Sequence, residues 1–597
     1  MSRAGRGLLL ALGLWLLLGH ALVLPAIERG ALPWLVDLAG HPPEIVARFV
    51  SNLVARVALV LALTTLLVSV GPRRLGLSPF FARFVGPARP EVLGFLRFTT
   101  ASILFISVAW EDVAGSAALP ASMRDAHGLF AWVAAIPGFD AFSSDAGALA
   151  VFRTVTLVVL GAAALGAFSR VTVPLGAALY FVVAGLMRQP TWPYHTGLVP
   201  LYAMAVLAFF PSGDGLSIDA WLARRRDGST TLERDTRDPR SALYGWGRFA
   251  WFATLALPYT EAGLSKLCNG GLTWWEPINL RAILYLDSLN PMEFDFDLGL
   301  AAAPLPDAFF ALLGLSAVLG EVAMVFVLFS RRARLVAPAV MIAMHVGIVL
   351  LQNILFFDLI LMLAATYAMP LFDRDGGPCS PLKNSSSPST GCFFLLGSFT
   401  KTPSSGQSPP EPPPKPAAPL KNEVLQRAAR DPRVRTSAPT DEVGPPHTAP
   451  PRAIVVALGV ALFFWTFAIE LFPFTAMQMY SHKRDTGVVD YHRLVAIHDD
   501  GARRQERPEA LFPALRDGRY RRVLRTCADD AQHAACRDFL ALLLEHGARD
   551  GVVAYEVEHR RWDFVAEPDA REGDVVAVVR FPHEPLVEQA SASPIDR

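Results

Sequence analysis

Charged side chains are scarce in this sequence. Only 18% of its 597 residues are Asp, Glu, Lys or Arg, whereas 52% are apolar and the mean hydropathy is +0.35. Such a composition excludes an ordinary soluble protein and indicates an integral membrane protein, with the lipid bilayer as its first partner. The net charge is zero, and no basic tract or patch of interleaved basic and aromatic residues occurs. A nucleic-acid partner is therefore not expected.

Lysine is the scarcest charged residue, with six lysines against 48 arginines. Lys266 is the only lysine before residue 383, and the other five fall in a Pro-rich segment or in the C-terminal part. Arginine stays protonated, whereas a buried lysine can lose its proton and act as a base. The exception at Lys266 therefore favours a functional lysine there.

Common catalytic and metal-binding motifs are missing. The chain has no Walker loop, HExxH motif, paired CxxC motif or nucleophile elbow. Three of its five cysteines show no metal-ligand spacing: Cys268, Cys379 and Cys392. The other two, Cys527 and Cys536, permit a disulfide but do not require one. The segment GDGLSID, residues 213–219, predicts a turn and a helix cap rather than a metal loop.

Long apolar runs are abundant. A helix needs about 20 predominantly apolar residues to cross a bilayer. We expect about eleven such spans, centred near residues 16, 62, 105, 157, 179, 203, 255, 318, 343, 362 and 462. The predicted fold is an all-α multi-pass membrane helix bundle. The first run also suits a signal peptide, because Arg3 and Arg6 precede LLLALGLWLLL, but no small-x-small cleavage site follows, which favours a retained anchor.

Arginines in the short loops set the predicted orientation. Arginines occur in the N-terminal segment and in the loop after every second span, and such segments are expected in the cytoplasm. These arginines are Arg3, Arg6, Arg73, Arg74, Arg83, Arg89, Arg170, Arg224, Arg225, Arg226, Arg331, Arg332 and Arg334. Glu111 and Asp112 then lie outside. We expect a protein of the cell inner (plasma) membrane whose C-terminal domain is external.

The spans and loops divide the chain into five parts. Residues 1–88 form N-terminal spans and residues 89–373 a central membrane domain. Residues 374–452 are rich in Pro and Ser, which predicts a disordered cytoplasmic linker. Residues 453–475 form the last span, and residues 476–597 a small external α+β domain. In that domain DYHRLVAIH, VVAYEVEHRRWDF and VVAVVRFP predict strands, and ACRDFLALLLEHG predicts a helix.

Lys266 ends an apolar span in the stretch PYTEAGLSKLCNGGLTWW, residues 258–275. A charge inside a membrane span is costly and indicates function. The alternative is a lysine that snorkels to the interface beside Trp274 and Trp275. Small residues one turn back, Ala262 and Gly263, would leave room beside the amine on the face that also carries Tyr259. Glu261 should point elsewhere.

Two histidines are predicted to share the depth of Lys266, and one glutamate is predicted to lie deeper. His195 opens a span from outside, and His345 lies about two turns below the outer end of another, roughly 10 Å at 1.5 Å per residue. Each is a candidate catalytic residue with Lys266; a hydrogen-bonded interfacial histidine and a satisfied core histidine are the alternatives. Glu321 lies deeper, where it either contributes to the site or simply pairs with a neighbour.

The order of these features resembles one family. Five features in this order are similar to the horizontally transferred transmembrane (HTTM) domain: W-x-x-H at Trp192, FPSGDGLSIDAW, AGLSKL with a following G-x-x-W, an acidic span, and His345 eight residues before an Asn. The resemblance covers about Arg89 to Asp373. The best-known member of the family is the vitamin K-dependent gamma-carboxylase.

The resemblance implies a chemistry. In the carboxylase the lysine matching Lys266 deprotonates vitamin K hydroquinone, and the histidines matching His195 and His345 belong to the same active region. Oxygenation of the quinol then provides a base strong enough to deprotonate the gamma carbon of a Glu, which takes up carbon dioxide. We therefore expect a reduced naphthoquinone as cofactor, contacted by Tyr259 and Glu321, no metal, and an external peptide or a lipid as substrate.

The sequence also departs from the family. Ser265 and Cys268 flank Lys266, where the family enzyme often has charged residues, and only about 120 external residues follow the last span, too few for a matching peptide-docking region. The alternative is a non-catalytic HTTM protein, either a membrane scaffold or an accessory factor for export or immunity that contacts an external protein. A transporter is less favoured, because no inverted repeat or pair of broken helices occurs.

Overall fold

The computed structural model describes residues 3–39, 42–70, 84–191, 195–227, 240–373, 452–469, 471–475, 480–484 and 486–582. Met1–Gly377 and Thr448–Arg597 belong to one compact unit. The predicted linker, residues 374–452, lies outside the described residues except for Arg452. Trp192 of the W-x-x-H motif and three of the loop arginines, Arg73, Arg74 and Arg83, also lie outside them.

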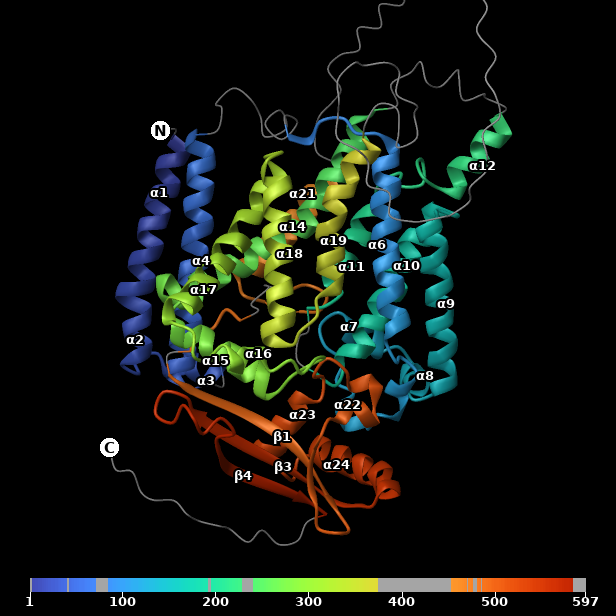
Figure 1. Cartoon of the computed structure of the whole chain (residues 1–597). Helices are drawn as coiled ribbons and strands as arrows, with labels where there is room; N and C mark the ends of the chain where they lie inside the picture. The colour runs from blue at the N-terminus through green and yellow to red at the C-terminus, as the bar shows by residue number, and fades with distance from the viewer. Residues whose placement is uncertain are drawn as a thin grey trace, which may run out of the picture. The chain divides into compact units, whose positions relative to one another are not determined.

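Most of the described chain is helical (Figure 1). The main helices of the N-terminal half are α1 (Arg3–Leu16), α2 (Leu24–Glu28), α4 (Pro43–Val70), α6 (Pro90–Trp110), α9 (Ala146–Leu165), α10 (Ser169–Arg188) and α11 (Leu198–Leu207). A π-helical segment joins α1 to α2. They are followed by α14 (Ala242–Gly270), α15 (Pro277–Leu289), α17 (Asp307–Ala323), α18 (Ala333–Gln352), α19 (Phe357–Ala368) and α21 (Arg452–Thr466). Short helices connect them: α3 (Pro33–Ala39), α7 (Phe130–Ala134), α8 (Phe139–Ser143), α12 (Ile218–Asp227) and α16 (Leu298–Ala301).

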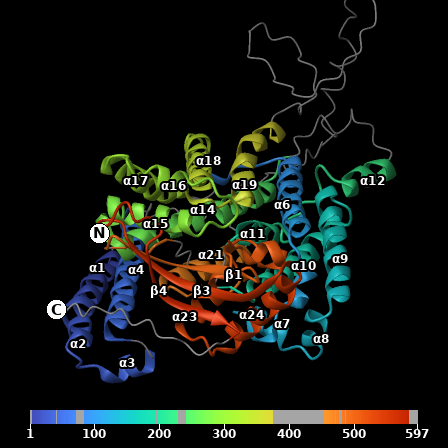
Figure 2. The same cartoon turned by 60° about the horizontal axis from the view of Figure 1, so that its bottom comes forward.

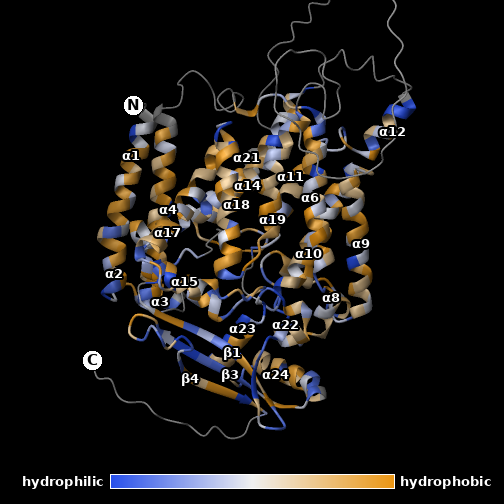
Figure 3. Cartoon of the chain, in the orientation of Figure 1, coloured by the Kyte–Doolittle hydropathy of each residue, from blue (hydrophilic) through white to orange (hydrophobic). Residues whose placement is uncertain are grey.

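Within the described ranges, seven helical segments are long and apolar enough to cross a membrane: Gly5–Glu28, Pro43–Leu66, Pro90–Trp110, Ala146–Leu165, Ser169–Arg188, Asp307–Leu328 and Ala333–Gln352. They appear mostly orange in Figure 3. The count of about eleven spans is not confirmed. The other four predicted centres fall on α11 and α19, which are apolar but short, on α14, and on α21.

Local sequence explains where these helices begin and end. Asp145 caps α9, because its carboxylate accepts hydrogen bonds from Gly147 N at 2.8 Å and Ala148 N at 3.2 Å. The helix stops at Gly166, whose φ of 71° suits glycine. Ser217 caps α12 by accepting from Ala220 N at 2.9 Å, so GDGLSID forms the predicted turn and cap.

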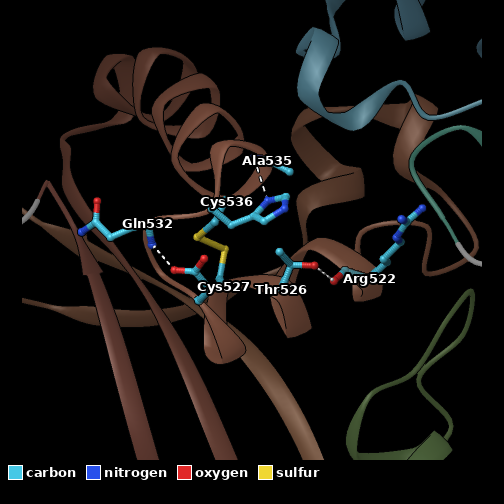
Figure 4. Close-up of a disulfide and its surroundings, with 8 residues drawn as sticks. Arg522, Thr526, Cys527, Gln532, Ala535 and Cys536 are labelled. Carbon is cyan, nitrogen blue, oxygen red and sulfur yellow. Dashed lines mark hydrogen bonds between the residues drawn. A yellow bond between two sulfur atoms is a disulfide. The ribbon is translucent and has the colours of Figure 1, made fainter. Parts of the chain in front are cut away.

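The C-terminal part forms a small antiparallel sheet in the order β2-β1-β3-β4. The predicted strands are confirmed as β1 (Val488–His498), β3 (Val552–Asp563) and β4 (Asp574–Phe581), and the predicted helix as α24 (Ala534–Gly547). The sequence did not predict β2 (Arg503–Glu506), α22 (Pro508–Leu511) or α23 (Arg521–Asp529). α23 and α24 pack against the sheet (Figures 1 and 2), and the Cys527–Cys536 disulfide joins them (Figure 4).

Ion pairs hold the sheet domain, residues 486–582, against one end of the helices, which we call the sheet side (Figure 1). Arg519, only 1% exposed, donates to the two carboxylate oxygens of Glu111 at 2.8 and 2.5 Å, just beyond α6. Arg522 pairs with Asp125 at 3.1 Å. The sheet side therefore includes the end of α6 and the loop after it.

Candidate functional site

The candidate site is built on α14, which packs against α4, α6, α11 and α17 in the helical part (Figures 1 and 2). Gly263 lies where α14 approaches α17 closely. A Cβ on Gly263 would lie 2.9 Å from the Cβ of Glu321 and 3.0 Å from the backbone N of Val322. Only glycine fits at that distance. The AGLSKL sequence therefore brings the next turn of α14 against Glu321.

Lys266 lies on that next turn and pairs with Glu321. Its Nζ is 2.8 Å from each of the two carboxylate oxygens. Lys266 is 4% exposed and Glu321 6%, so Lys266 does not snorkel to water. The Nζ also lies 5.4 Å from the centre of the Trp274 ring. We call this contact the lysine pair. Glu321 therefore does pair with a neighbour, and that neighbour is the candidate base Lys266 itself.

Tyr259 and His345 form a second buried contact, which we call the tyrosine pair. The Tyr259 hydroxyl lies 2.6 Å from His345 Nε2. Tyr259 stands seven residues before Lys266 on α14 and so shares its face. The Phe356 ring stands edge-on to His345, with ring centres 5.4 Å apart. His345 Nδ1 has no hydrogen-bond partner among the described residues. Three helices, α14, α17 and α18, thus bring four of the five predicted residues together as two pairs.

His195, the fifth predicted residue, contacts Thr475 instead of a member of the two pairs. Its Nδ1 lies 3.4 Å from the Thr475 hydroxyl. Two residues on, Gly197 N donates to Asp358 Oδ2 at 2.8 Å. Asp358 is 1% exposed, and its Oδ1 has no hydrogen-bond partner in the described part of the chain. Our sequence reading missed Asp358, although an acidic residue in the apolar run FFDLILML meets the same criterion that selected Lys266.

Arg56 is a second residue that the sequence reading missed. It is fully buried in α4, where it donates to Ser265 Oγ at 3.0 Å and to the Trp465 carbonyl at 2.5 Å. Trp465 Nε1 donates to Ser265 Oγ and to the Glu261 carbonyl, both at 3.1 Å. The Glu261 carbonyl therefore lies beside Trp465, which also contacts Ser265. Arg56 could have been selected from the sequence, because it is a charged residue inside the second predicted span.

Residues 480–484 cover the sheet-side end of α14. Trp274 Nε1 donates to the Tyr480 carbonyl at 2.9 Å, and Asn269 Nδ2 donates to Ser481 Oγ at 2.6 Å. Beside this cover lies a cavity of about 350 Å³, whose lining includes Asn52, Asn269 and His482. The lining also includes Cys268, which lies on the turn of α14 that follows Lys266.

Comparison with protein-family models, with curated proteins and with solved structures found no match. The resemblance to the HTTM domain therefore remains one of motifs and their order, and the chemistry of the site has to be argued from the two pairs.

Proposed function

We propose that this chain is a multi-pass membrane protein with an HTTM, vitamin K-dependent gamma-carboxylase-like domain that acts as a quinol-dependent carboxylase. In this proposal Lys266 is the base, and His345 and His195 belong to its active region. One observation carries the proposal: the lysine pair and the tyrosine pair lie on one face of α14, both buried and hydrogen-bonded. Buried acid–base groups that contact one another through hydrogen bonds are typical of catalytic centres.

The lysine pair suits proton transfer in an apolar setting. When the proton moves from Lys266 Nζ to Glu321, both groups become neutral at once, so no isolated charge is left in the bundle. The neutral amine then accepts a proton from a ligand hydroxyl, and the carboxylate stabilises the ammonium that forms. Glu321 acts here as the positioning partner of the base.

The residues around the two pairs fit a reduced naphthoquinone. The Nδ1 of His345, which has no hydrogen-bond partner among the described residues, offers a hydrogen bond to a ring oxygen. Trp274 and Phe356 provide aromatic surfaces beside Lys266 and His345. Such a quinol would supply the acidic hydroxyl for Lys266 and, through its oxidation, the driving force for removing a proton from carbon. Tyr259 holds His345 in place, with its hydroxyl on Nε2.

For the membrane topology we propose that the sheet side is external and that the protein lies in the cell inner membrane. Three features support this orientation. Glu111, expected outside from the charge pattern, lies on the sheet side with the ion-paired Arg519. The ends of α10 and α14 also face that side, through Thr191 with Arg522 and Trp274 with Tyr480. The Cys527–Cys536 disulfide is typical of an oxidising compartment.

Quinol binding tests the proposed function. Purified protein in detergent is titrated with a short-chain reduced naphthoquinone under anaerobic conditions. The test variant is Lys266→Met with Glu321→Gln, which removes the base without leaving a buried carboxylate unpaired. The matched control is Lys483→Met, because Lys483 pairs with Glu276 at 2.7 Å in a more exposed place. We expect the wild type and the control to bind alike, and the test variant to bind at least about tenfold more weakly.

The same titration decides the alternative. One feature favours a non-catalytic scaffold. The buried Arg519 holds the sheet domain firmly on the helices, and a firmly held domain suits stable binding of a partner protein. If the wild type does not bind the quinol, or binds it no better than the Lys266→Met/Glu321→Gln variant, the scaffold replaces the enzyme as the proposed function.

A further inference from the structure

The cavity beside residues 480–484 has a polar lining that the proposed function does not use. Its volume of about 350 Å³ is typical of a site for a small ligand. Seven of the ten described residues that line it have polar or charged side chains, and they come from α2, α4, α14 and residues 480–484. Three helices and a loop thus place polar groups around one space, which indicates a binding site.

The cavity lies where two apolar segments reach the sheet side. One of them, Gly5–Glu28, ends at Glu28, and the other, Pro43–Leu66, begins one residue before Glu44. Both glutamates line the cavity. Figure 1 shows α2 and the start of α4 at the sheet-side end of the helices. Charged residues at the ends of membrane spans lie at the depth of the lipid headgroups, so the cavity is at that depth as well.

Side chains of both charges line the cavity. Glu28 and Glu44 supply two carboxylates, and Arg48 supplies a guanidinium. Among the described residues, none of these three side chains takes part in an ion pair. The two carboxylates would repel an anionic ligand, and the guanidinium would repel a cationic one. A ligand that carries one positive and one negative charge complements both.

Two amide side chains of the lining add one donor and one acceptor. Asn52 is 8% exposed, and its Oδ1 accepts from Arg56 Nε at 2.9 Å, which leaves its NH₂ group as a donor for the cavity. Asn269 Nδ2 donates to Ser481 Oγ at 2.6 Å, which leaves its carbonyl oxygen as an acceptor. The amides therefore also suit a ligand with an anionic and a cationic end.

A polar stripe on α4 runs from the cavity beside an apolar surface. Four residues spaced by four form this stripe along one side of the helix: Glu44, Arg48, Asn52 and Arg56. Ile45 and Phe49 adjoin it and are 50% and 51% exposed. Within a membrane span, such exposed apolar side chains contact lipid chains. The same part of α4 therefore offers polar groups to a headgroup and apolar groups to the chains attached to it.

We propose that the cavity binds the headgroup of an aminophospholipid such as phosphatidylethanolamine. Its phosphate binds Arg48 through charge-assisted hydrogen bonds, with the NH₂ group of Asn52 as a second donor. Its ammonium group lies between Glu28 and Glu44, and its acyl chains follow the apolar surface of α4. Free phosphoethanolamine carries the same two charges, so only the acyl chains distinguish the lipid from this soluble source. The site does not depend on the proposed function.

Native mass spectrometry of the full chain, released from detergent micelles, tests the site without a quinol. The micelles contain phosphatidylethanolamine or phosphatidylglycerol with the same acyl chains; the second lipid has the phosphate but no amine. We expect phosphatidylethanolamine to bind at least about fivefold more tightly, and soluble phosphoethanolamine at the same concentration not to displace it. Equal binding of the two lipids, or no retained lipid, overturns the proposal. Displacement by phosphoethanolamine would assign the cavity to a soluble ligand and overturn the lipid as its source.

Variants of the lining then test where the headgroup binds. Arg48→Gln should weaken binding of both lipids at least about tenfold, because both have a phosphate. Glu28→Gln/Glu44→Gln should make the two lipids bind equally, because the amine loses its partners. The controls are Arg29→Gln and Asp37→Asn, which remove exposed charges near the cavity but outside its lining, and they should bind like the wild type. Unchanged binding in Arg48→Gln, a preference kept in Glu28→Gln/Glu44→Gln, or an equal loss in the controls overturns the proposed site.

Discussion

Replacing Lys266 by methionine removes the positive charge while keeping a long unbranched side chain. Glu321, 6% exposed, then loses the cation that lies 2.8 Å from both of its oxygens. Removing one partner of a buried ion pair typically costs about 3–5 kcal/mol, because the remaining charge is desolvated and unpaired. Replacing both partners by neutral side chains of similar volume is often close to neutral. We therefore expect Lys266→Met to be strongly destabilising, and the Lys266→Met/Glu321→Gln double variant to lie within about 1 kcal/mol of the wild type.

The measurement is the free energy of unfolding in detergent, from denaturant titration of the wild type, both single variants and the double variant. The coupling energy from this cycle should be at least about 2 kcal/mol. Lys483→Met is the control, since its partner Glu276 is 44% exposed, and an exposed pair contributes about 0–1 kcal/mol. If Lys266→Met lowers the free energy of unfolding no more than Lys483→Met does, Lys266 and Glu321 do not form a buried ion pair.

Three further predictions use the same protein. Gly263→Ala should lower the free energy of unfolding by about 1–3 kcal/mol and weaken quinol binding, because the new Cβ would lie 2.9 Å from the Cβ of Glu321. Unchanged stability and binding would contradict the close contact of α14 with α17. Burial and the negative charge of Asp517 raise the folded pKa of Glu293 to about 8 from 4.5, so the folded state binds the extra proton and stability should fall as pH rises between these values. Glu293→Gln should make the free energy of unfolding depend less on pH, as measured by denaturant titrations at several pH values. An unchanged pH dependence in this variant would refute the raised pKa of Glu293. Cys527→Ala/Cys536→Ala should lower the stability of the sheet domain by about 2–3 kcal/mol, given the sequence separation of 9, measured by near-UV circular dichroism on heating; wild-type stability in this variant would show that the disulfide does not form.

The elements with a marked local composition could be predicted from the sequence. β1 and β3 are runs rich in Val, Tyr and other strand-forming residues. β2 was missed because RRQE has no apolar residue and becomes a strand only by pairing with β1. α15 was missed because it is too short for a span and lies against α17 and β1. Its burial comes from tertiary packing, which no local window contains.

The site was predictable residue by residue but not as pairs. Lys266, Glu321 and His345 stood out as polar groups in apolar runs, and Asp358 and Arg56 would have stood out by the same criterion. Their pairing depends on which helices touch. Glu321 meets Lys266 because Gly263 admits α17 at close range, and a lone glycine in a sequence does not show which helix it faces. The tyrosine pair needs in addition the register between α14 and α18.

Two neighbouring residues of α14 therefore carry different tasks, and this affects how variants should be interpreted. Ser265 accepts from Arg56 and Trp465, which ties α14 to α4 and α21. Lys266, the next residue, faces Glu321 on α17. Loss of the Ser265 contacts leaves buried donors unsatisfied and lets the helix rotate or shift, so it would displace Lys266 as well. A loss of quinol binding in a Ser265 or Arg56 variant would consequently report helix position. Chemistry at Lys266 is isolated only by substitutions, such as the double variant with Glu321, that leave the Arg56–Ser265–Trp465 contacts in place.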